Sequence, residues 1–507
     1  MTKLFASFLS LSLLIVSCTS PTPIATHTPT KLPATPTQTS AVSQNPWDDR
    51  TVFQAGLVKS AQPVLNELQG ATVYHLEFKI AEDMVHVTGA EEVRYTNTET
   101  IILDEIQLRL FPNILGGEMQ VTNLLVNGQA ADPKYALANS LMIVPLSNPL
   151  EPGQSVILKM DFAVTVPQEV TLNYGVLAYY DEVLTLAHAY PMICVYDDEG
   201  WNAEIPPQDG DVTYAETSFY LVQITAPKGL TLVTSGQRLS SDEAGQDQIM
   251  NVANGPARDF YLVASPNFEE VTQTFGEVTV HSYARKEFVN GAQFALDTAS
   301  KALDVFSKRY AQYPYTELDI VATPTLALGI EYPGMVAIAD RIYNVDGEYR
   351  GSPASIYMES TVAHEVGHQW FYGLVGDDQL DDPWLDESLT QFATLQYYTD
   401  LYGADGADGF RASLEDRWAR VENAQIPIGL PVAGYTGGEY GAIVYGRGPL
   451  FFAALKNEMG ADIFDVFIKD YTEINAWGIA TPENLQALAE KHCACELDAL
   501  FAEWVYP

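Results

Sequence analysis

One short segment of the chain carries residue types that could bind a metal ion. His364-Glu365-Val366-Gly367-His368 places two histidines four positions apart. On a helix, residues with this spacing share a face, so both imidazoles could reach one ion while Glu365 contacts a water on it. The apolar flanking residues Trp370 and Phe371 favour a half-buried helix over a helix with two surface histidines.

Glu387 is the predicted third ligand of that ion. It stands in Trp384-Leu385-Asp386-Glu387-Ser388, with eighteen residues between it and His368. Asp382-Pro383 is typical of a helix start, so Glu387 should lie in the first turns of the next helix. Three protein ligands leave a fourth position for water or substrate, which is the arrangement of a catalytic zinc site.

The surrounding sequence predicts a β-rich part followed by a mainly helical part. Between about residues 71 and 266, apolar and polar residues alternate, and turn signals such as Asn127-Gly128 separate the runs, which predicts an antiparallel all-β domain. From about Glu287 the apolar spacing changes to three or four residues, as along the stripe from Phe288 to Phe306. We expect an N-terminal all-β domain over 47–266 and a catalytic domain over 267–507.

The charge of the chain excludes several kinds of partner. Its 507 residues include 66 acidic side chains against 26 Lys and Arg, for a net charge of −40. A nucleic-acid-binding protein needs basic residues to displace counterions from phosphates, so we expect no nucleic-acid partner. Docking on anionic lipid through a basic surface is disfavoured as well. The excess of acidic residues is typical of a soluble, exported protein. A more specific explanation is that it attracts cationic substrates. The oligomeric state is not indicated.

The N-terminus predicts export. Residues 1–17 combine Lys3 with an apolar run too short to span a bilayer, and the run ends in Ser17-Cys18, which resembles the lipobox of bacterial lipoproteins. The resemblance implies cleavage before Cys18, lipidation of its thiol and a membrane-anchored, extracytoplasmic protein; plain secretion is the alternative. Residues 18–46, rich in Thr and Pro, predict an extended tether. No later apolar run is long enough for another span.

Two further features have less chemical meaning. The three remaining cysteines, Cys194, Cys493 and Cys495, are an odd number, which argues against a closed disulfide framework, and a metal site at His492-Cys493-x-Cys495 lacks a second cluster. An acidic stretch between the ligand segments fits no calcium-loop spacing, so we expect a solvated surface loop there. Its members are Asp377, Asp378, Asp381 and Asp382.

The metal-binding pattern and other segments resemble the M1 family of zinc aminopeptidases, which are gluzincins, in a short bacterial lipoprotein form. Gly329-Ile330-Glu331-Tyr332-Pro333-Gly334 resembles the family's Gly-Ala-Met-Glu-Asn signature, and Tyr445-Gly446-Arg447-Gly448 resembles its Tyr-x-Lys-Gly segment. In the β-rich part, 210–216 and 226–230 resemble the family's N-terminal domain. The resemblance covers roughly 70–507 and implies an antiparallel β saddle or sandwich domain followed by a thermolysin-like, mainly helical zinc-peptidase domain.

The resemblance also implies a function and a role for each site residue. The function is that of a zinc metallo-aminopeptidase, which removes N-terminal residues from peptides with free N-termini by means of a zinc-activated water. One catalytic Zn²⁺ would have His364, His368 and Glu387 as ligands, with Glu365 as general base. Tyr445, with Tyr440 as its rival, would stabilise the oxyanion, Glu331 would bind the substrate α-amine, and Gly329 would allow close approach of the substrate-binding strand.

Departures from the family pattern leave two alternatives. The sequence stops at Pro507, so we expect no helical domain of the kind that closes over the active site in longer members. A zinc endopeptidase with an open cleft is therefore the second hypothesis, and a lipid-anchored, non-catalytic binding scaffold is the third. Gln391, one turn after Glu387, offers no carboxylate where thermolysin-like sites often have one. The residues that orient the two histidines are accordingly not predicted.

Overall fold

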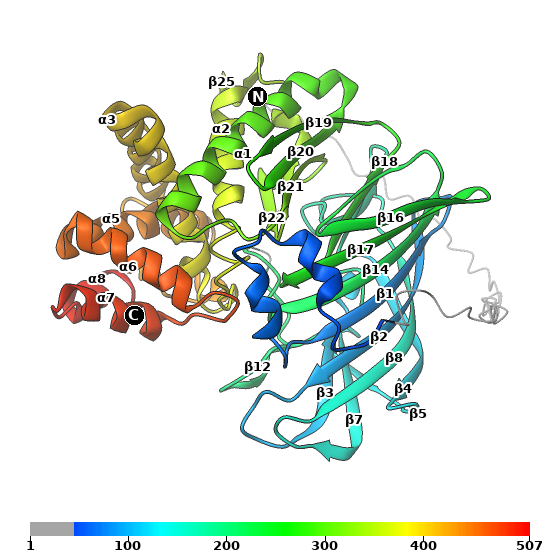
Figure 1. Ribbon diagram of the computed structural model, residues 1–507. Helices are drawn as coiled ribbons and strands as arrows, with labels where there is room; N and C mark the ends of the chain where they lie inside the picture. The colour runs from blue at the N-terminus through cyan, green and yellow to red at the C-terminus, as the bar shows by residue number, and fades with distance from the viewer. Residues whose placement is uncertain (1–44, 208, 507) are drawn as a thin grey trace, which may run out of the picture. The chain divides into compact units, whose positions relative to one another are not determined.

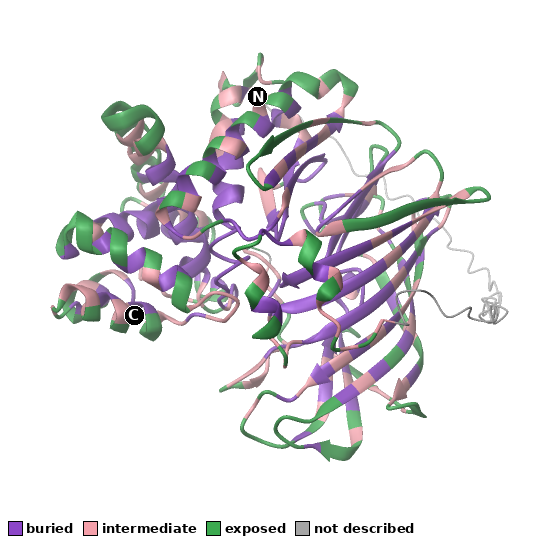
Figure 2. Cartoon of the chain, in the orientation of Figure 1, coloured by how far each residue is buried: buried purple, intermediate pink, exposed green. Residues whose placement is uncertain are grey.

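The larger β-sheet is built from strands whose residues alternate between its two faces. The computed structural model describes residues 45–207 and 209–506. In β8 (Ser155–Thr165) every second side chain is buried, and Figure 2 shows the same alternation along neighbouring strands. The sheet runs in the order β16-β17-β14-β1-β2-β8-β4-β5. The other strands are β16 (Gln237–Ala244), β17 (Asp247–Ala257), β14 (Ser218–Pro227), β1 (Val73–Ile80), β2 (His86–Thr96), β4 (Glu118–Val126) and β5 (Gln129–Ala130).

Most strand pairs in this region are antiparallel, as the alternation predicts. Asn127 and Gly128 both have positive φ and close the β4–β5 hairpin, where Val126 pairs with Gln129. One pair differs, because β1 and β14 are parallel. The chain between these two strands is long enough to cross back over the sheet, which a parallel pair requires.

Two four-stranded sheets and a short hairpin complete the β-rich region. Their orders are β15-β18-β10-β9 and β11-β3-β7-β6. The bounds are β15 (Thr231–Thr234), β18 (Tyr261–Ser265), β10 (Val183–Ala187), β9 (Leu177–Tyr180), β11 (Met192–Ile193), β3 (Leu103–Arg109), β7 (Leu141–Leu150), β6 (Lys134–Ala136), β12 (Tyr196–Asp197) and β13 (Gly200–Trp201).

A five-stranded mixed sheet follows, and its crossover helix is the predicted helical stripe. The sheet has the order β19-β20-β21-β23-β22, with β20, β21 and β23 parallel. Figure 1 shows α1 (Val289–Arg309) alongside β19–β21. The small and apolar residues of this helix are buried. The strands are β19 (Phe268–Phe275), β20 (Val278–Arg285), β21 (Glu317–Thr323), β23 (Met335–Ala339) and β22 (Gly329–Tyr332), and the short pair β24 (Glu348–Tyr349) and β25 (Ser352–Pro353) comes next. The predicted boundary at residues 266 and 267 falls between β18 and β19.

Helices dominate the remainder, which confirms the predicted order of a β-rich part and then a helical part. Trp370, Trp384 and Phe451 are fully buried in their common core. The helices are α2 (Ala354–Gly367), α3 (Leu389–Ala419), α4 (Glu439–Ala442), α5 (Gly448–Met459), α6 (Ala461–Ile474), α7 (Pro482–Cys493) and α8 (Asp498–Trp504). Within residues 45–207 and 209–506, no helix combines the length and apolarity needed to cross a membrane.

One buried arginine connects the β-rich region to the helical region. Arg258 follows β17, and its side chain donates hydrogen bonds to main-chain carbonyls only. The acceptors are Ala215 in the β-rich region, Tyr372 and Leu374 after α2, and Gly478 between α6 and α7. The guanidinium therefore ties three distant segments together in a position where burial lowers its pKa.

Two expectations about minor features are wrong. Cys493 and Cys495 form a disulfide despite the odd cysteine count, and Cys194 is a buried free thiol. Asp377, expected in a solvated loop, is 5% exposed, whereas Asp381 is exposed as expected. The signal peptide, Cys18 and most of the tether lie outside the described residues.

Candidate active site

The helix α2 positions both histidines of the sequence motif. His364 lies in its last turn and His368 caps its end, and both side chains are buried. The helix ends at Gly367, because the chain turns sharply after His368. There the Gly373 amide donates back to the His368 carbonyl, and Tyr372 has a positive φ of 113°.

Two π-helical turns position the other side chains of the site. The turn Trp384–Ser388 precedes α3 and carries Glu387, and the turn Ile443–Arg447 precedes α5 and carries Tyr445. A π turn contains an extra residue, and such turns frequently occur at functional sites. The Tyr445 hydroxyl donates a hydrogen bond to Oε1 of Glu387, so the two turns meet at the site.

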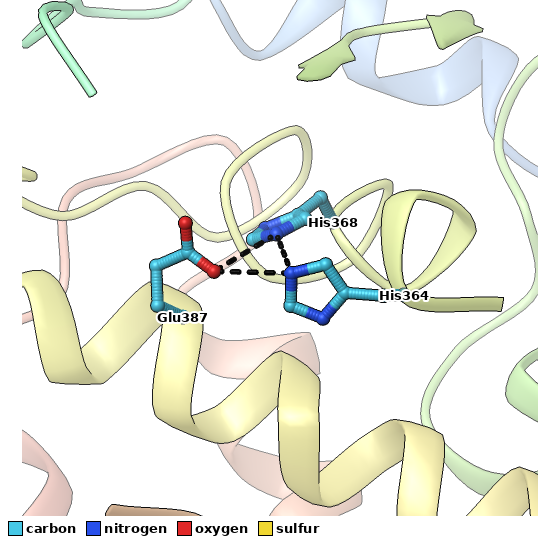
Figure 3. Close-up of side chains that lie close together, drawn as sticks. All are labelled: His364, His368 and Glu387. Carbon is cyan, nitrogen blue, oxygen red and sulfur yellow. Dashed lines mark hydrogen bonds and ion pairs between the residues drawn. The ribbon is translucent and has the colours of Figure 1, made fainter. Parts of the chain in front are cut away.

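Three donor atoms converge with separations that fit a zinc ion. His364 Nε2 lies 3.1 Å from His368 Nε2 and 3.1 Å from Glu387 Oε2, and His368 Nε2 lies 3.5 Å from the same oxygen. Figure 3 shows the three side chains pointing toward a common point. Tetrahedral Zn²⁺ with ligand distances of 2.0–2.2 Å requires donors roughly 3.3–3.5 Å apart. This donor set therefore fits one zinc ion and leaves a fourth position free.

The ionisation of two ligands suits a cation. Burial lowers the pKa of His364 to about 4, so near neutral pH its imidazole is uncharged and has a lone pair to offer. Burial alone would raise the pKa of Glu387, but contacts with His364 and His368 hold it well below the usual range. Glu387 is therefore an anion, as a zinc-binding carboxylate must be.

Asp386 and Gln379 support the site, and neither was predicted from sequence. Asp386 Oδ1 lies 2.5 Å from Nδ1 of His368, so the carboxylate fixes the imidazole with Nε2 directed at the metal position. Gln379 Nε2 donates to Asp386 Oδ2 at 2.6 Å and to Glu331 Oε1 at 3.1 Å. The only sequence signal for Asp386 is a second carboxylate directly before the ligand Glu387.

Glu365 and Glu331 lie on opposite sides of a close contact between α2 and β22. Gly329 packs so tightly against Glu365 that a Cβ there would lie 2.3 Å from Oε1 of that carboxylate. Oε2 of Glu365 is buried without a hydrogen-bond partner among the described residues. Glu331, two residues along β22, is 6% exposed, and burial raises its pKa to about 8, with further contributions from Asp386 and Glu387. Both carboxyls are thus held at the metal position with free acceptor capacity.

A single cavity of about 1290 Å³ joins these residues. It is lined by the three candidate metal ligands and by Glu331, Glu365, Tyr440 and Tyr445. Of the two tyrosines, Tyr445 contacts Glu387, while the Tyr440 hydroxyl has no hydrogen-bond partner in the part of the chain that the structure describes. Asp211, from the loop that precedes β14, also lines the cavity and was not predicted.

Comparison with known proteins shows which proteins this chain is similar to. Residues 294–504 match the peptidase family M1 domain. Aminopeptidase M1 of Arabidopsis thaliana is 24% identical over 299 residues, covering 56% of this chain and 33% of that protein. Aminopeptidase N of Lactobacillus helveticus is 24% identical over 383 residues, covering 69% of this chain and 44% of that protein. The chain thus spans less than half the length of these relatives.

Solved structures show the same fold over most of both chains. The M1 zinc metallopeptidase of Deinococcus radiodurans has a TM-score of 0.62 and 19% identity, covering 87% of this chain and 94% of that one. A mutant of that protein, described as bound to a Tyr-Ser-Ala substrate, has a TM-score of 0.62 at 19% identity and covers 86% and 94%. Residues 294–504 thus match the peptidase family M1 domain, within a chain that has the two-domain fold of M1 zinc metallopeptidases.

Proposed function

We propose that the chain is a zinc metallo-aminopeptidase that removes N-terminal residues from peptides. The observation that carries the proposal is the convergence of His364, His368 and Glu387 in one cavity with Glu331 and Glu365. The M1 domain match and the aminopeptidase names of its relatives support the same activity. The peptide bound to the Deinococcus structure supports peptides as the substrate class.

The side chains divide the reaction between them. When bound, zinc would polarise the scissile carbonyl and lower the pKa of the attacking water. A carboxylate oxygen of Glu365 takes the proton from that water and delivers it to the leaving nitrogen. The Tyr445 hydroxyl, which donates to Glu387 in this structure, turns to the developing oxyanion.

Glu331 gives the proposed reaction its exopeptidase character. Its buried carboxyl has a pKa raised to about 8, and an ammonium beside it would favour the ionised form. The ion pair would then form within a site shielded from water, where charge-assisted hydrogen bonds are strong. A peptide held by its α-ammonium at Glu331 presents its first peptide bond to the metal position.

Hydrolysis of matched peptides tests this function. One peptide has a free N-terminus, the other is N-acetylated, and both are assayed before and after zinc removal. We expect zinc-dependent release of only the first residue from the free peptide. The Glu331→Ala variant should lose turnover of the free peptide while it keeps one zinc per chain. Unchanged kinetics in that variant would remove the role of Glu331.

The size of the cavity favours one alternative, a zinc endopeptidase. Its lining extends from Leu172 and Ile205 in the β-rich region to Phe410 on α3, so a longer chain has room on both sides of the metal position. Internal cuts, or equal cleavage of the acetylated peptide, would establish this alternative. No cleavage with zinc bound would favour the non-catalytic scaffold.

The cellular location is a separate proposal. The lipobox-like Ser17-Cys18 and the Thr/Pro-rich 18–46 support an extracytoplasmic lipoprotein anchored through Cys18. In a bacterial host, the wild-type chain should sediment with membranes and the Cys18→Ser variant should not. Equal distribution of both proteins would contradict the anchor.

A further inference from the structure

The cavity has two chemically different ends. Glu331 lies beside His368 and Asp386, where carboxyls gather. Arg417 also lines the cavity, with its guanidinium carbon 5.8 Å from the centroid of the Tyr445 ring, and that ring is 6.0 Å from the His364 imidazole. The lining thus offers a carboxyl beside His368 and a guanidinium beside Tyr445.

Tight packing fixes Arg417 at its end of the cavity. The residue belongs to the last turn of α3, and the π-helical turn with Tyr445 packs directly on that turn. A Cβ at Gly446 would lie 3.0 Å from the Arg417 Cβ and 2.8 Å from the Trp418 amide nitrogen. Any side chain at Gly446 would push the two segments apart, so Arg417 and Tyr445 hold a set separation.

Apart from the Tyr445 ring, the Arg417 guanidinium has no partner among the described residues. Among residues 45–207 and 209–506, no hydrogen bond or ion pair to its guanidinium is found. Two other arginines that are at least partly buried are paired: Arg309 binds Asp400 through two nitrogens, and Arg447 binds main-chain carbonyls. In a chain with 66 acidic residues and 26 Lys and Arg, an arginine that lines a cavity with five donors free is unusual.

Nearby acids do not explain the arginine. Glu359, Asp405 and Asp416 also line the cavity. Glu359 accepts hydrogen bonds from Tyr397 and Tyr402 instead. Arg420, one turn further, also lines the cavity but is exposed.

We propose that Arg417 binds the C-terminal carboxylate of a short peptide whose α-ammonium lies at Glu331. This inference rests on the proposed function and specifies its substrate class: oligopeptides of a few residues with both ends free. A guanidinium matches a carboxylate with two parallel hydrogen bonds, which gives orientation as well as affinity. The two ends of the cavity would then measure peptide length, since each extended residue adds about 3.3–3.6 Å.

The test compares free acids with their amides on the zinc-loaded full chain. Di-, tri- and tetrapeptides of the series Leu-Gly, Leu-Gly-Gly and Leu-Gly-Gly-Gly are assayed with a C-terminal carboxylate or carboxamide. For the peptide length that reaches both Glu331 and Arg417, we expect kcat/KM of the acid to be about tenfold to a hundredfold higher than that of the amide. This is the difference that a hydrogen-bonded charge pair predicts. The acid-to-amide ratio should fall toward one in Arg417→Gln and recover in part in Arg417→Lys. The control Arg411→Gln, on the same helix but outside the described cavity lining, should keep the wild-type ratio.

Equal rates for acids and amides at every length in the wild type would overturn the inference, as would an unchanged ratio in Arg417→Gln. Either result leaves the proposed function intact, because N-terminal residues are still released. If the wild type hydrolyses no peptide, the proposed function fails separately. Calorimetric binding of the same acid and amide pair to Glu365→Gln and to Glu365→Gln with Arg417→Gln then decides the role of Arg417. Tighter binding of the acid that depends on Arg417 supports it, and equal binding contradicts it.

Discussion

The Oγ atom of Ser388 donates a hydrogen bond of 2.6 Å to the main-chain carbonyl of Val444. Ser388 directly follows Glu387, and Val444 directly precedes Tyr445. This single bond therefore joins the π-helical turn of a metal ligand to the π-helical turn of the proposed oxyanion donor. The relative position of these two side chains depends on how closely the turns approach.

Gly448→Ala should disturb that approach. A Cβ at Gly448 would lie 1.9 Å from Ser388 Oγ, so the turns must separate, at a cost of about 1–3 kcal/mol typical of overpacking. We expect a lower melting temperature and a kcat reduced at least tenfold. In the control Gly441→Ala, the new Cβ meets nothing within 4 Å. Differential scanning calorimetry and peptide hydrolysis would check both variants, and equal behaviour would contradict the prediction.

Gly329→Ala should impair the general base without removing the metal. The added methyl would occupy the position of the Glu365 carboxylate, which must then rotate away from the attacking water. Loss of a positioned general base costs about 10²–10⁴-fold in rate. Kinetics and zinc content by atomic absorption are the measurements, with Glu365→Gln as the reference. Near wild-type turnover in Gly329→Ala would mean that Glu365 tolerates displacement or is not the base.

Gln379→Ala should act on substrate binding. Its amide donates to both Glu331 and Asp386, so removal leaves the Glu331 carboxyl free to leave its position. We expect KM for free-amine peptides to rise about tenfold, with a smaller change in kcat. Gln379→Glu should be worse, because it replaces a donor with a third carboxylate. A KM within twofold of wild type in both variants would show that Glu331 is held by other means.

The acidic stretch predicts a pH dependence of stability. Burial, then repulsion from Asp378 and Asp381, raises the pKa of Asp382 to about 7. The folded chain therefore keeps a proton that the unfolded chain loses near pH 4, and this stabilising contribution, complete below pH 4, disappears as the pH rises through 7. We expect a lower melting temperature at pH 8 than at pH 5.5.

Replacing the titrating group tests that explanation. Asp382→Asn should reduce the difference in melting temperature between the two pH values by about 2 °C or more. Asp132→Asn removes a charge from an exposed position and should keep the wild-type difference. If both variants show the same difference, Asp382 does not contribute to the pH dependence.

Part of the site could be predicted from sequence because its geometry is local. The spacing of His364 and His368 on one helix face determines how they converge, and the apolar periods determined the order of β-rich and helical parts. The π-helical turns could not be predicted, since they depend on contacts such as Gly448 with Ser388. In a regular helix, consecutive side chains point about 100° apart, so Asp386 and Glu387 would not be expected to face the same site. Asp386 was therefore not predicted. Gln379 and Arg417 reach the site only through tertiary packing, which no spacing rule describes.

Arg258 has a consequence for dividing this chain into separate domains. Arg258 belongs to the β-rich region, and its guanidinium donates to the Tyr372 and Leu374 carbonyls on the segment that follows the histidine helix. A gene fusion that joins residues 267–507 to a foreign module would leave those carbonyls buried without donors, or open to solvent. Residues 267–507 are therefore unsuited to transfer into a chimaeric protein by themselves. A chimaera must also contain β17 and the Arg258 that follows it.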